Sequence, residues 1–383
     1  MKRLPLSEPY LRGKEIKYLE QCIKTNWLSG SGTYVNLFEK HIANFTSSKY
    51  SIGIINGTSA LHLALKVLGC KPGNEIIVPT LTFVATVNAV IYNNCSPIFM
   101  DSDKYYNIDE EKTLNFLKKN TLFKNGKTIN KKTKKVIFAI IVVHVWGNAA
   151  KFDKLLKYCK LRNIKVVEDA SESLGTKYTN GSFKNLHTGA AGDIGCMSFN
   201  TNKIITCGSG GMVLTNNKIH YNKAFYLSTQ AKNDPIFYIH NSTGYNYRLN
   251  NLNAAVGLAQ FENFDKILKK KQKIHKIYKN KINKIPGLKI AEVPDYASNN
   301  CWLNVLSIDK NYKFSLTKLI NKFSQNNIEV RPIWFLNHKQ KMFKKYQTYK
   351  IENSVKQIKS SLCLPSSTSL SEASIERVVN LLK

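Results

Sequence analysis

Residues 197–211 read MSFNTNKIITCGSGG, and this stretch decides how the rest of the sequence is interpreted. It begins as a short apolar run that predicts a strand, and it ends in Gly208, Gly210 and Gly211. Between the two lies Lys203, with no acidic residue anywhere in the segment. Glycine allows close approach of the backbone, so we expect these glycines to pack against a flat cofactor.

Lysine reacts as a nucleophile only when its amine is neutral. At the reference pKa of about 10.4, only about one lysine in a few thousand is neutral at pH 7. A desolvated, cation-rich pocket lowers a lysine pKa and prepares the amine to form a Schiff base. Lys203 is therefore a candidate catalytic residue. The alternative is an ordinary surface lysine before a turn, because all but six of the 57 basic residues are lysines.

Short apolar runs alternate with helical patterns between residues 50 and 216. The runs are continuous and rich in Val and Ile, which is typical of a mostly parallel sheet covered by helices on both faces. The expected strands lie within residues 50–55, 75–83, 96–103, 134–147, 164–171, 195–200 and 211–216. The sequence therefore predicts an α/β fold whose ligands bind where loops leave the carboxyl ends of the strands.

A smaller domain is predicted towards the C-terminus. Residues 250–282 have the pattern of one long helix, and the sequence IPGL at 285–288 ends it. Shorter strand and helix patterns follow, which indicates an α+β domain. We therefore divide the chain into a large domain, residues 1–262, and a small C-terminal domain, residues 263–383.

The formal net charge of +32 would suit a polyanionic partner. Proteins that read nucleic-acid grooves rely on arginine, however, because its planar fork pairs with phosphates and guanine edges. The lysines here are scattered, and the densest runs, residues 124–135 and 266–284, are predicted to be a surface loop and a solvated helix face. We expect no nucleic-acid partner, and attraction of an anionic metabolite is a simpler use of the charge.

Several features bear on the cellular compartment. No apolar run reaches the roughly 18 residues that a membrane span needs, and MKRLPLSEPY lacks the apolar core of a signal peptide. The eight cysteines form no CxxC pair and no metal-ligand spacing. We expect a cytoplasmic protein with reduced thiols, no membrane segment and no bound metal.

Residues 56–65, NGTSALHLAL, predict a helix that begins after a strand. A helix N-terminus carries about half a positive charge and unpaired amides, so Gly57, Thr58 and Ser59 are candidate phosphate ligands. The alternative is ordinary capping by Thr58 or Ser59. Ser198, five residues before Lys203, is a further candidate hydrogen-bond donor to a phosphate.

Two more segments contain candidate binding residues. Residues 166–175, VVEDASESLG, place Glu168 and Asp169 where a predicted strand ends. An acid at that point can hold a protonated ring nitrogen of a cofactor, at about 1.4 kcal/mol per pKa unit, or it can cap the next helix. Residues 242–255 carry Asn246 and Arg248 on an aromatic-rich loop, for which structural anchoring is the alternative.

Taken in order, the glycine-containing helix start, the strand-end aspartate and the serine–lysine segment follow the layout of pyridoxal-phosphate enzymes. The chain resembles the nucleotide-sugar aminotransferases of the DegT/DnrJ type, in the aspartate-aminotransferase fold class. The resemblance runs nearly from end to end. It rests on LPLSEPYL (4–11), NWLSGSGTYVNLFEKHIANF (26–45), NGTSALHLAL (56–65), VPTLTFVATVNAV (78–90), EDASESLG (168–175), GDIGCMSFNTNKIITCGSGGMVLTN (192–216), GYNYRLNNLNAAVGLAQ (244–260) and CLPSSTSL (363–370).

This resemblance implies a three-layer α/β/α large domain of fold type I that binds pyridoxal 5′-phosphate. It implies that Lys203 forms the Schiff base and carries the proton, and that Asp169 pairs with the pyridine nitrogen. Phe83 would stack on the cofactor face, with plain core burial as the alternative. The other implied cofactor contacts come from Gly57, Thr58, Ser59, Glu172, Ser198 and Asn246.

Asn246 would reach the site of a neighbouring subunit, so the resemblance implies a homodimer with shared active sites. Arg248 would lie near the same boundary and meet a substrate carboxylate or phosphate. Arg331, in VRPIW, would grip the donor carboxylate or brace the small domain. The remaining implied substrate contacts are Trp27, Ser29 and His187.

One position narrows the implied substrate. Three residues after Asp169, relatives commonly carry Gln or His, whereas this chain has Glu172. The segments ESLG (172–175), HTG (187–189) and FNTNKIIT (199–206) are most similar to the 4-aminotransferases of legionaminic-acid and related diamino-sugar pathways. FNTNK replaces the FHPTK of many relatives. Relatives that dehydrate sugars have histidine in place of the lysine, so Lys203 favours transamination.

The function implied is transfer of an amino group from L-glutamate to C4 of a nucleotide-linked 4-keto-6-deoxy sugar for surface glycan biosynthesis. The first acceptor considered is a UDP-linked 2-acetamido-2,6-dideoxy-4-ketohexose, and a GDP- or dTDP-linked 4-keto-6-deoxyhexose is the alternative. A basic nucleic-acid-binding or regulatory protein is the alternative from another class. It would bind DNA with steep salt dependence and show no cofactor absorbance.

Overall fold

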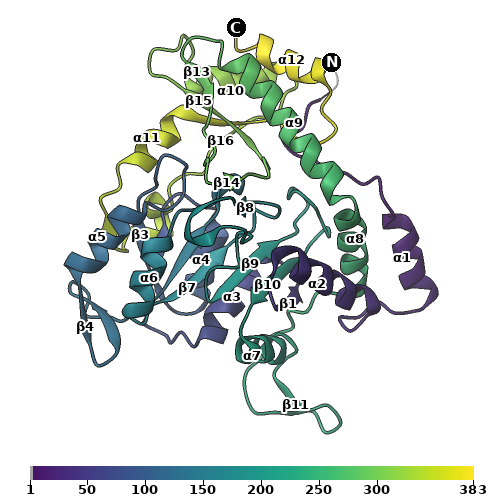
Figure 1. Ribbon diagram of the computed structural model, residues 1–383, viewed down its shortest axis with the longest axis vertical. Helices are drawn as coiled ribbons and strands as arrows, with labels where there is room; N and C mark the ends of the chain where they lie inside the picture. The colour runs from purple at the N-terminus through teal and green to yellow at the C-terminus, as the bar shows by residue number, and fades with distance from the viewer. Residues whose placement is uncertain (1–2) are drawn as a thin grey trace.

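The computed structural model describes residues 3–383. Its centre is an eight-stranded sheet with the strand order β1-β10-β9-β7-β6-β2-β3-β17 (Figure 1). The strands from β9 to β17 are parallel to one another, whereas β10 runs antiparallel to β1 and β9. The prediction of a mostly parallel sheet is therefore confirmed.

The strands of this sheet are β1 (Tyr50–Ile54), β2 (Glu75–Pro79), β3 (Ser96–Met100), β6 (Ile137–Val143), β7 (Lys165–Asp169), β9 (Ile194–Ser198), β10 (Gly211–Thr215) and β17 (Thr348–Tyr349). Each apolar run expected to be a strand contains one of them. Only β17 has no counterpart in that expectation, because two residues carry no period. Alternate residues of β6 point to opposite faces, so Ile141 joins one hydrophobic core while Ile140 and Val142 join another.

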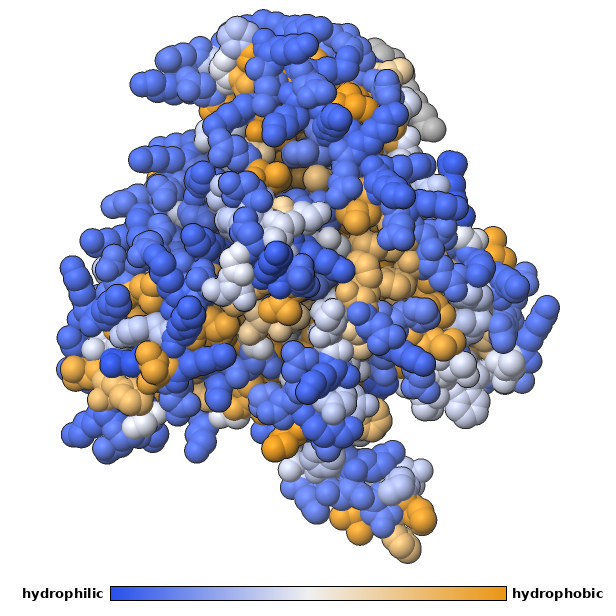
Figure 2. All heavy atoms as spheres, in the orientation of Figure 1, coloured by the Kyte–Doolittle hydropathy of each residue, from blue (hydrophilic) through white to orange (hydrophobic). Residues whose placement is uncertain are grey.

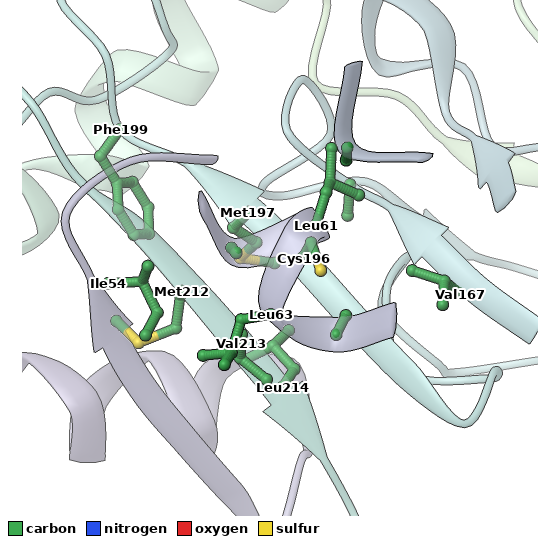
Figure 3. Packing of buried hydrophobic residues seen from close by; sticks show 14 of the residues in the cluster. Ile54, Leu61, Leu63, Val167, Cys196, Met197, Phe199, Met212, Val213 and Leu214 are labelled. Atoms are coloured by element: carbon green, nitrogen blue, oxygen red, sulfur yellow. The ribbon is translucent and has the colours of Figure 1, made fainter. Parts of the chain in front are cut away.

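Helices cover both faces of the sheet and make three layers. α3 (Gly57–Leu68) and α4 (Val84–Tyr92) bury apolar side chains in the first core, while α5 (Glu110–Asn120) and α6 (Asp153–Leu161) bury theirs in the second. Figure 3 shows Leu61 and Leu63 of α3 among the side chains of β9 and β10. The other helices of this part are α1 (Glu15–Lys24), α2 (Thr33–Thr46), α7 (Lys218–Ser228) and α8 (Asn251–Glu262).

A second, antiparallel sheet forms the small C-terminal domain, as predicted (Figure 1). Its strands, in spatial order, are β13 (Leu288–Ile290), β15 (Asn304–Ile308), β18 (Ser361–Leu364) and β16 (Arg331–Pro332). Its helices are α9 (Phe264–Ile282), α10 (Leu316–Gln325), α11 (Asn353–Ser360) and α12 (Glu372–Asn380). The short strands β8 (Lys177–Tyr178) and β14 (Ala297–Ser298) pair between the two domains.

The predicted long helix over residues 250–282 is two helices. α8 ends at Glu262 and α9 begins at Phe264, because Asn263 leaves helical geometry with ψ near 6°. Two segments also cross the division expected at residue 262. The Leu4 amide donates to the Asn327 carbonyl (2.9 Å) in the small domain, and β17 extends the large sheet at its β3 edge.

Two hairpins leave the body of the molecule. Part of the lysine-rich run 124–135, predicted to be a surface loop, belongs to the hairpin of β4 (Thr121–Lys124) and β5 (Lys127–Asn130). Asn125 and Gly126 close it with φ values of 51° and 70°, as an Asn-Gly turn favours. The hairpin of β11 (Lys232–Asp234) and β12 (Ile239–His240) projects away from α7, and apolar side chains lie at its tip (Figures 1 and 2).

Within residues 3–383, no helix combines the length and apolar character needed to cross a bilayer. The eight cysteines are all buried and carry free thiols. The fold therefore relies on hydrophobic burial and backbone pairing, without a disulfide among the described residues.

Candidate active site

A cavity of about 160 Å³ lies at the carboxyl ends of the central strands. It receives side chains from α3 and α4, from the ends of β6, β7 and β9, and from two loops of the small domain. The lining residues are Asn56, Gly57, Thr58, Leu61, Thr82, Phe83, Ala85, Thr86, Val143, Asp169, Ser171, Glu172, Ser198, Asn200, Asn202, Lys203, Trp302 and Trp334. A larger hollow, of about 1210 Å³, lies on the small domain and contains none of the predicted site residues.

The N-terminus of α3 opens into this cavity. The helix is capped by Asn56, whose Oδ1 accepts a hydrogen bond from the Ser59 amide (2.8 Å), so the expectation of capping by Thr58 or Ser59 is wrong. A side-chain carbon added at Gly57 would lie 2.8 Å from Cβ of Ser198. Only glycine therefore lets the helix start sit beside Ser198 at the end of β9. Helix amides and a serine hydroxyl meet here, which suits an anion.

Asp169 is the last residue of β7 and is 5% exposed. Its Oδ2 accepts a hydrogen bond from Oγ1 of Thr86 (2.7 Å), and its Oδ1 accepts one from the Ser171 amide (3.2 Å). Thr86 belongs to the first turn of α4, and its hydroxyl also lies 2.9 Å from that of Thr82. The carboxylate is thus held in one orientation at the cavity wall, where a buried charge needs a partner.

Glu168, next to Asp169, points to the other side of the strand. Its carboxylate accepts hydrogen bonds from Nε2 of His144 (3.0 Å) and from the amides of Gly189, Ala191 and Gly192. Burial raises the pKa of Glu168, but these donors outweigh it and hold the pKa below its usual value. Glu168 therefore anchors the loop before β9 and has no place in the cavity.

Lys203 lies on the loop that joins β9 to β10. The loop is closed by backbone bonds from Phe199 to Gly210 (2.8 Å) and from Cys207 to Phe199 (2.9 Å). A side-chain carbon on Gly211 would lie 2.5 Å from the Asn56 carbonyl carbon. The expectation that the glycines pack against a cofactor is wrong for Gly211, which is needed because β10 passes against the start of α3.

The Lys203 amine lies between a carboxylate and an aromatic ring. Its Nζ is 3.4 Å from Oε1 of Glu172 and 4.4 Å from the centre of the Trp302 ring. Burial raises the pKa of Glu172 to about 7, although Lys203 and the Trp146 amide, which donates to Oε2 (2.8 Å), both lower it. Trp146 has a positive φ of 53°, an uncommon conformation that costs about 1–3 kcal/mol for a bulky residue. The strained turn therefore aims its amide at Glu172.

Aromatic side chains form the rest of the wall. Phe83 is 53% exposed, so it is not the plain core residue of the alternative interpretation. Its ring centre lies 6.2 Å from that of Trp334, and Trp334 packs 5.2 Å from Trp146. Trp302 donates from Nε1 to the Asn202 carbonyl (2.7 Å), beside Lys203. Trp302 and Trp334 come from the small domain and were missed, because no local pattern links them to residues 200–203.

These residues are shared with a known group of enzymes. The model of the DegT/DnrJ/EryC1/StrS aminotransferase family matches residues 9–383. The chain belongs to this family.

The GDP-perosamine synthase of Escherichia coli O157:H7 is 36% identical, over 92% of this chain and 90% of its own. The GDP-perosamine synthase of Vibrio cholerae is 33% identical, over 99% and 98% of the two chains. The crystal structure of a DegT DnrJ EryC1 StrS aminotransferase from Brucella abortus has a TM-score of 0.86 at 23% identity, covering 96% of this chain and 94% of that chain. The predicted type I fold is thereby confirmed, as is the assignment to nucleotide-sugar aminotransferases.

Members of this aminotransferase family depend on pyridoxal phosphate, and the residues present fit it. The α3 N-terminus with Gly57, Thr58 and Ser198 matches the phosphate. Asp169, a buried carboxylate, matches a protonated ring nitrogen, and the primary amine of Lys203 matches the aldehyde. All five residues line the same cavity.

Ser59 and three further predicted contacts lie outside the cavity lining. Ser59 sits one residue beyond it, where its amide serves the Asn56 cap. Trp27 and Ser29 lie on the exposed connection between α1 and α2. Asn246 is exposed and forms a β-bridge with Thr229 of its own chain. Nothing within one subunit brings these last three side chains to Lys203.

The prediction that His187 binds substrate is contradicted by its burial. Its ring is 1% exposed, Nδ1 donates to the Thr188 carbonyl (2.6 Å) and Nε2 accepts from the Gly175 amide (2.7 Å). Burial lowers the pKa of His187 to about 4, so the ring is neutral at pH 7. With both nitrogens used, His187 joins two loops of the protein.

The two predicted substrate arginines are also engaged elsewhere. Nη1 of Arg248 donates to Oε1 of Glu39 (2.8 Å) and to the Gly53 carbonyl (3.1 Å), with both side chains largely buried. This pairing contradicts a substrate contact by Arg248 and favours the structural-anchoring alternative. Arg331 is exposed and pairs with Glu329 (2.6 Å). The residue of VRPIW that reaches the cavity is Trp334.

Proposed function

We propose that this protein transfers an amino group from L-glutamate to C4 of a nucleotide-linked 4-keto-6-deoxyhexose. The observation that carries the proposal is the convergence of the Lys203 amine and the Asp169 carboxylate on one cavity, with the anion-binding start of α3 beside them. A scaffold or nucleic-acid-binding protein would have no use for a buried carboxylate and a primary amine arranged in this way.

Bound pyridoxal phosphate supplies an electron sink and a carrier for the amino group. Asp169 would hold a proton on the ring nitrogen, because its carboxylate is buried and kept in place by Thr86. Lys203 would move the proton at the substrate carbon with its Nζ. Glu172 would hold that amine by its carboxylate, 3.4 Å away, and Trp302 would exclude water from one side of it.

Two sugar nucleotides are candidates for the acceptor. The GDP-perosamine synthases that align over almost the whole chain favour a GDP-linked 4-keto-6-deoxyhexose. The segments ESLG, HTG and FNTNKIIT favour a UDP-linked 2-acetamido-2,6-dideoxy-4-ketohexose. We propose the GDP-linked sugar as the first substrate to test, since it is supported by alignment over the full length. The UDP-linked sugar is the second candidate.

The experiment combines cofactor trapping with an isotope assay. Borohydride reduction of the holoenzyme followed by peptide mapping should place the cofactor on Lys203. Incubation with ¹⁵N-glutamate and each sugar nucleotide should yield a labelled 4-amino sugar by mass spectrometry. Lys203→Ala should abolish both results, while Lys184→Ala, at an exposed lysine, should leave them unchanged. A trapped cofactor on another side chain would refute the proposal.

We also propose a homodimer in which Asn246 completes the site of the partner subunit. Asn246 is exposed and lies outside the cavity of its own chain. The nearby β11–β12 hairpin exposes Ile236, Phe237 and Tyr238 at its tip, at 77%, 75% and 71% (Figure 2). Apolar side chains exposed together are typical of an interface, which supports association through this side of the molecule.

A further inference from the structure

Lys271 is a buried lysine in the small domain that the proposed reaction does not use. It lies on α9 and is 3% exposed, although the run 266–284 was predicted to be a solvated helix face. The buried residues of this helix, which form one stripe, are Phe264, Ile267, Lys271, Ile274, Tyr278 and Ile282. An apolar side chain at position 271 would serve the fold alone, so the ammonium group must have another role.

The amine of Lys271 has only carbonyl partners. Its Nζ donates to the backbone carbonyls of Trp302 (3.0 Å) and Ser366 (2.5 Å), and among the described residues it forms no ion pair. Burial lowers the pKa of Lys271 to about 7. Both the charged and the neutral amine can donate to a carbonyl, so the two bonds persist in either state.

Each carbonyl belongs to a loop that reaches another part of the molecule. Trp302 covers the Lys203 amine at 4.4 Å and donates from its ring to the Asn202 carbonyl. Its amide donates to Oδ1 of Asn300 (3.0 Å), and Nδ2 of Asn300 donates to the Glu172 carbonyl (2.8 Å). The Trp302 loop therefore touches both residues that make the ion pair of the cavity.

The second loop connects to the start of the described chain. The Ser366 amide donates to the Leu6 carbonyl (2.7 Å), and Oγ of Ser366 accepts from the Asn304 amide (2.9 Å). Lys271 thus joins the Trp302 loop to the loop after β18 through one side chain. A break at this point would leave the Trp302 carbonyl buried without a donor, which costs about 1–3 kcal/mol.

We propose that Lys271 is a positioning residue for Lys203 and acts through Trp302, by holding the Trp302 backbone so that its ring covers the Lys203 amine. The proposal rests on the proposed function, in which Lys203 is the residue that carries the cofactor. Lys271 itself does not line the cavity and touches neither substrate nor cofactor.

The test uses the full-length holoenzyme and Lys271→Met, which preserves side-chain length but donates no hydrogen bond. The readouts are the pH midpoint of the bound cofactor's absorbance change, and kcat and KM for the sugar nucleotide measured separately. We expect the midpoint to move by at least ~0.5 pH unit and kcat to fall about tenfold, with KM changed less than about twofold. Lys271→Arg, which can donate to both carbonyls, should restore the wild-type midpoint.

Tyr278→Phe is the matched control. Tyr278 lies on the same buried stripe and donates to the Pro365 carbonyl (3.1 Å), but it makes no hydrogen bond to Trp302. This variant should lower Tm without moving the midpoint or kcat. If Lys271→Met lowers Tm in the same way and leaves both readouts at wild-type values, Lys271 is only structural and the proposal is overturned.

Lys271→Gln keeps one donor and serves if Lys271→Met does not fold. A smaller shift of the midpoint in the same direction supports the proposal, and a wild-type midpoint with wild-type kcat overturns it. Borohydride trapping separates this result from the proposed function. If the cofactor is not trapped on Lys203 in the wild-type enzyme, the proposed function has failed. If it is trapped there and Lys271 variants behave as wild type, only this inference has failed.

Discussion

The Nζ of Lys203 lies 3.4 Å from Oε1 of Glu172, so the proposed catalytic amine has a carboxylate for a neighbour where most relatives were expected to place an amide or an imidazole. Glu172 is buried, and its carboxylate is held only by Lys203 and the Trp146 amide. Two donors do not replace the hydration that a carboxylate loses on burial, and the pKa of Glu172 therefore stands at about 7. The charge state of this pair changes close to neutral pH.

The stability of the apoprotein should record this titration. A folded pKa raised from 4.5 to about 7 makes Glu172 favourable below pH 4.5, and that contribution is lost as pH rises towards 7. Relative to Glu172→Gln, the free energy of unfolding of the wild type should fall by about 3 kcal/mol across this window. Urea denaturation of both proteins at several pH values measures the difference. Parallel curves would show that Glu172 has an ordinary pKa.

Glu168→Gln should give the opposite slope. The pKa of Glu168 is held below 4.5, so its contribution is present above pH 4.5 and is lost as pH falls through the folded pKa. Near pH 7 the variant should be less stable than wild type by about 2–4 kcal/mol, because three backbone donors and His144 lose a charged acceptor. The difference should shrink in acid. A loss that does not depend on pH would contradict this account.

Thr86→Val should weaken cofactor binding more than it weakens the fold. It removes the hydroxyl that donates to Oδ2 of Asp169, a bond to a charged group worth about 1.5–3 kcal/mol. We expect about a tenfold rise in the Kd of pyridoxal phosphate, measured by absorbance titration. Thr46→Val is the control, since that buried hydroxyl bonds only to helix carbonyls and Ser48. Equal cofactor affinity in the two variants would refute the role of Thr86.

Gly211→Ala should damage the anion site through a steric clash. The added carbon would lie 2.5 Å from the Asn56 carbonyl carbon, so β10 or the start of α3 must move. We expect a loss of about 1–3 kcal/mol in the free energy of unfolding, together with weaker cofactor binding. Gly126→Ala has open space but a φ of +70°, and it isolates the backbone cost of about 1–2 kcal/mol. Cofactor affinity should fall only in the first variant.

Mixed dimers test whether Asn246 acts across subunits. Asn246→Ala and Lys203→Ala should each be inactive alone. Unfolded together and refolded at equal amounts, they should recover about a quarter of wild-type activity, because half of the dimers are hybrids and each hybrid has one complete site. If Asn246 serves its own chain, hybrids contain no complete site and no activity returns. A monomeric protein would give the same null result, which sedimentation would identify.

Much of the large domain could be predicted from sequence because its signals are local. Continuous apolar runs such as residues 137–143 can be buried only in a covered sheet, and β6 occupies that run. Gly57, Asp169 and Lys203 could be found for a related reason, since each follows or precedes a strand that ends at the same edge of the sheet. Asn263 broke the predicted long helix without any Gly or Pro to announce it.

Residue type alone misjudged several side chains. His187 and Arg248 carry groups that often bind substrates, but the fold surrounds His187 with backbone partners and pairs Arg248 with Glu39. Lys271 had the opposite fate, because one of many lysines on α9 faces inward. Helical periodicity shows which residues share a face, but a charged residue is assigned to solvent unless a buried partner is known.

The sequence by itself determined the α/β fold class, the order of the chemical groups along the chain, and the identity of Lys203 and Asp169 as the residues to test. Only the tertiary structure decided that Thr86 supports Asp169, that Glu172 meets Lys203, and that Trp302 and Trp334 close the cavity from the small domain. The physical reason is chain separation. Trp302 and Asn202 lie 100 positions apart, and their contact depends on how two sheets are placed against each other, which no local pattern of residues encodes.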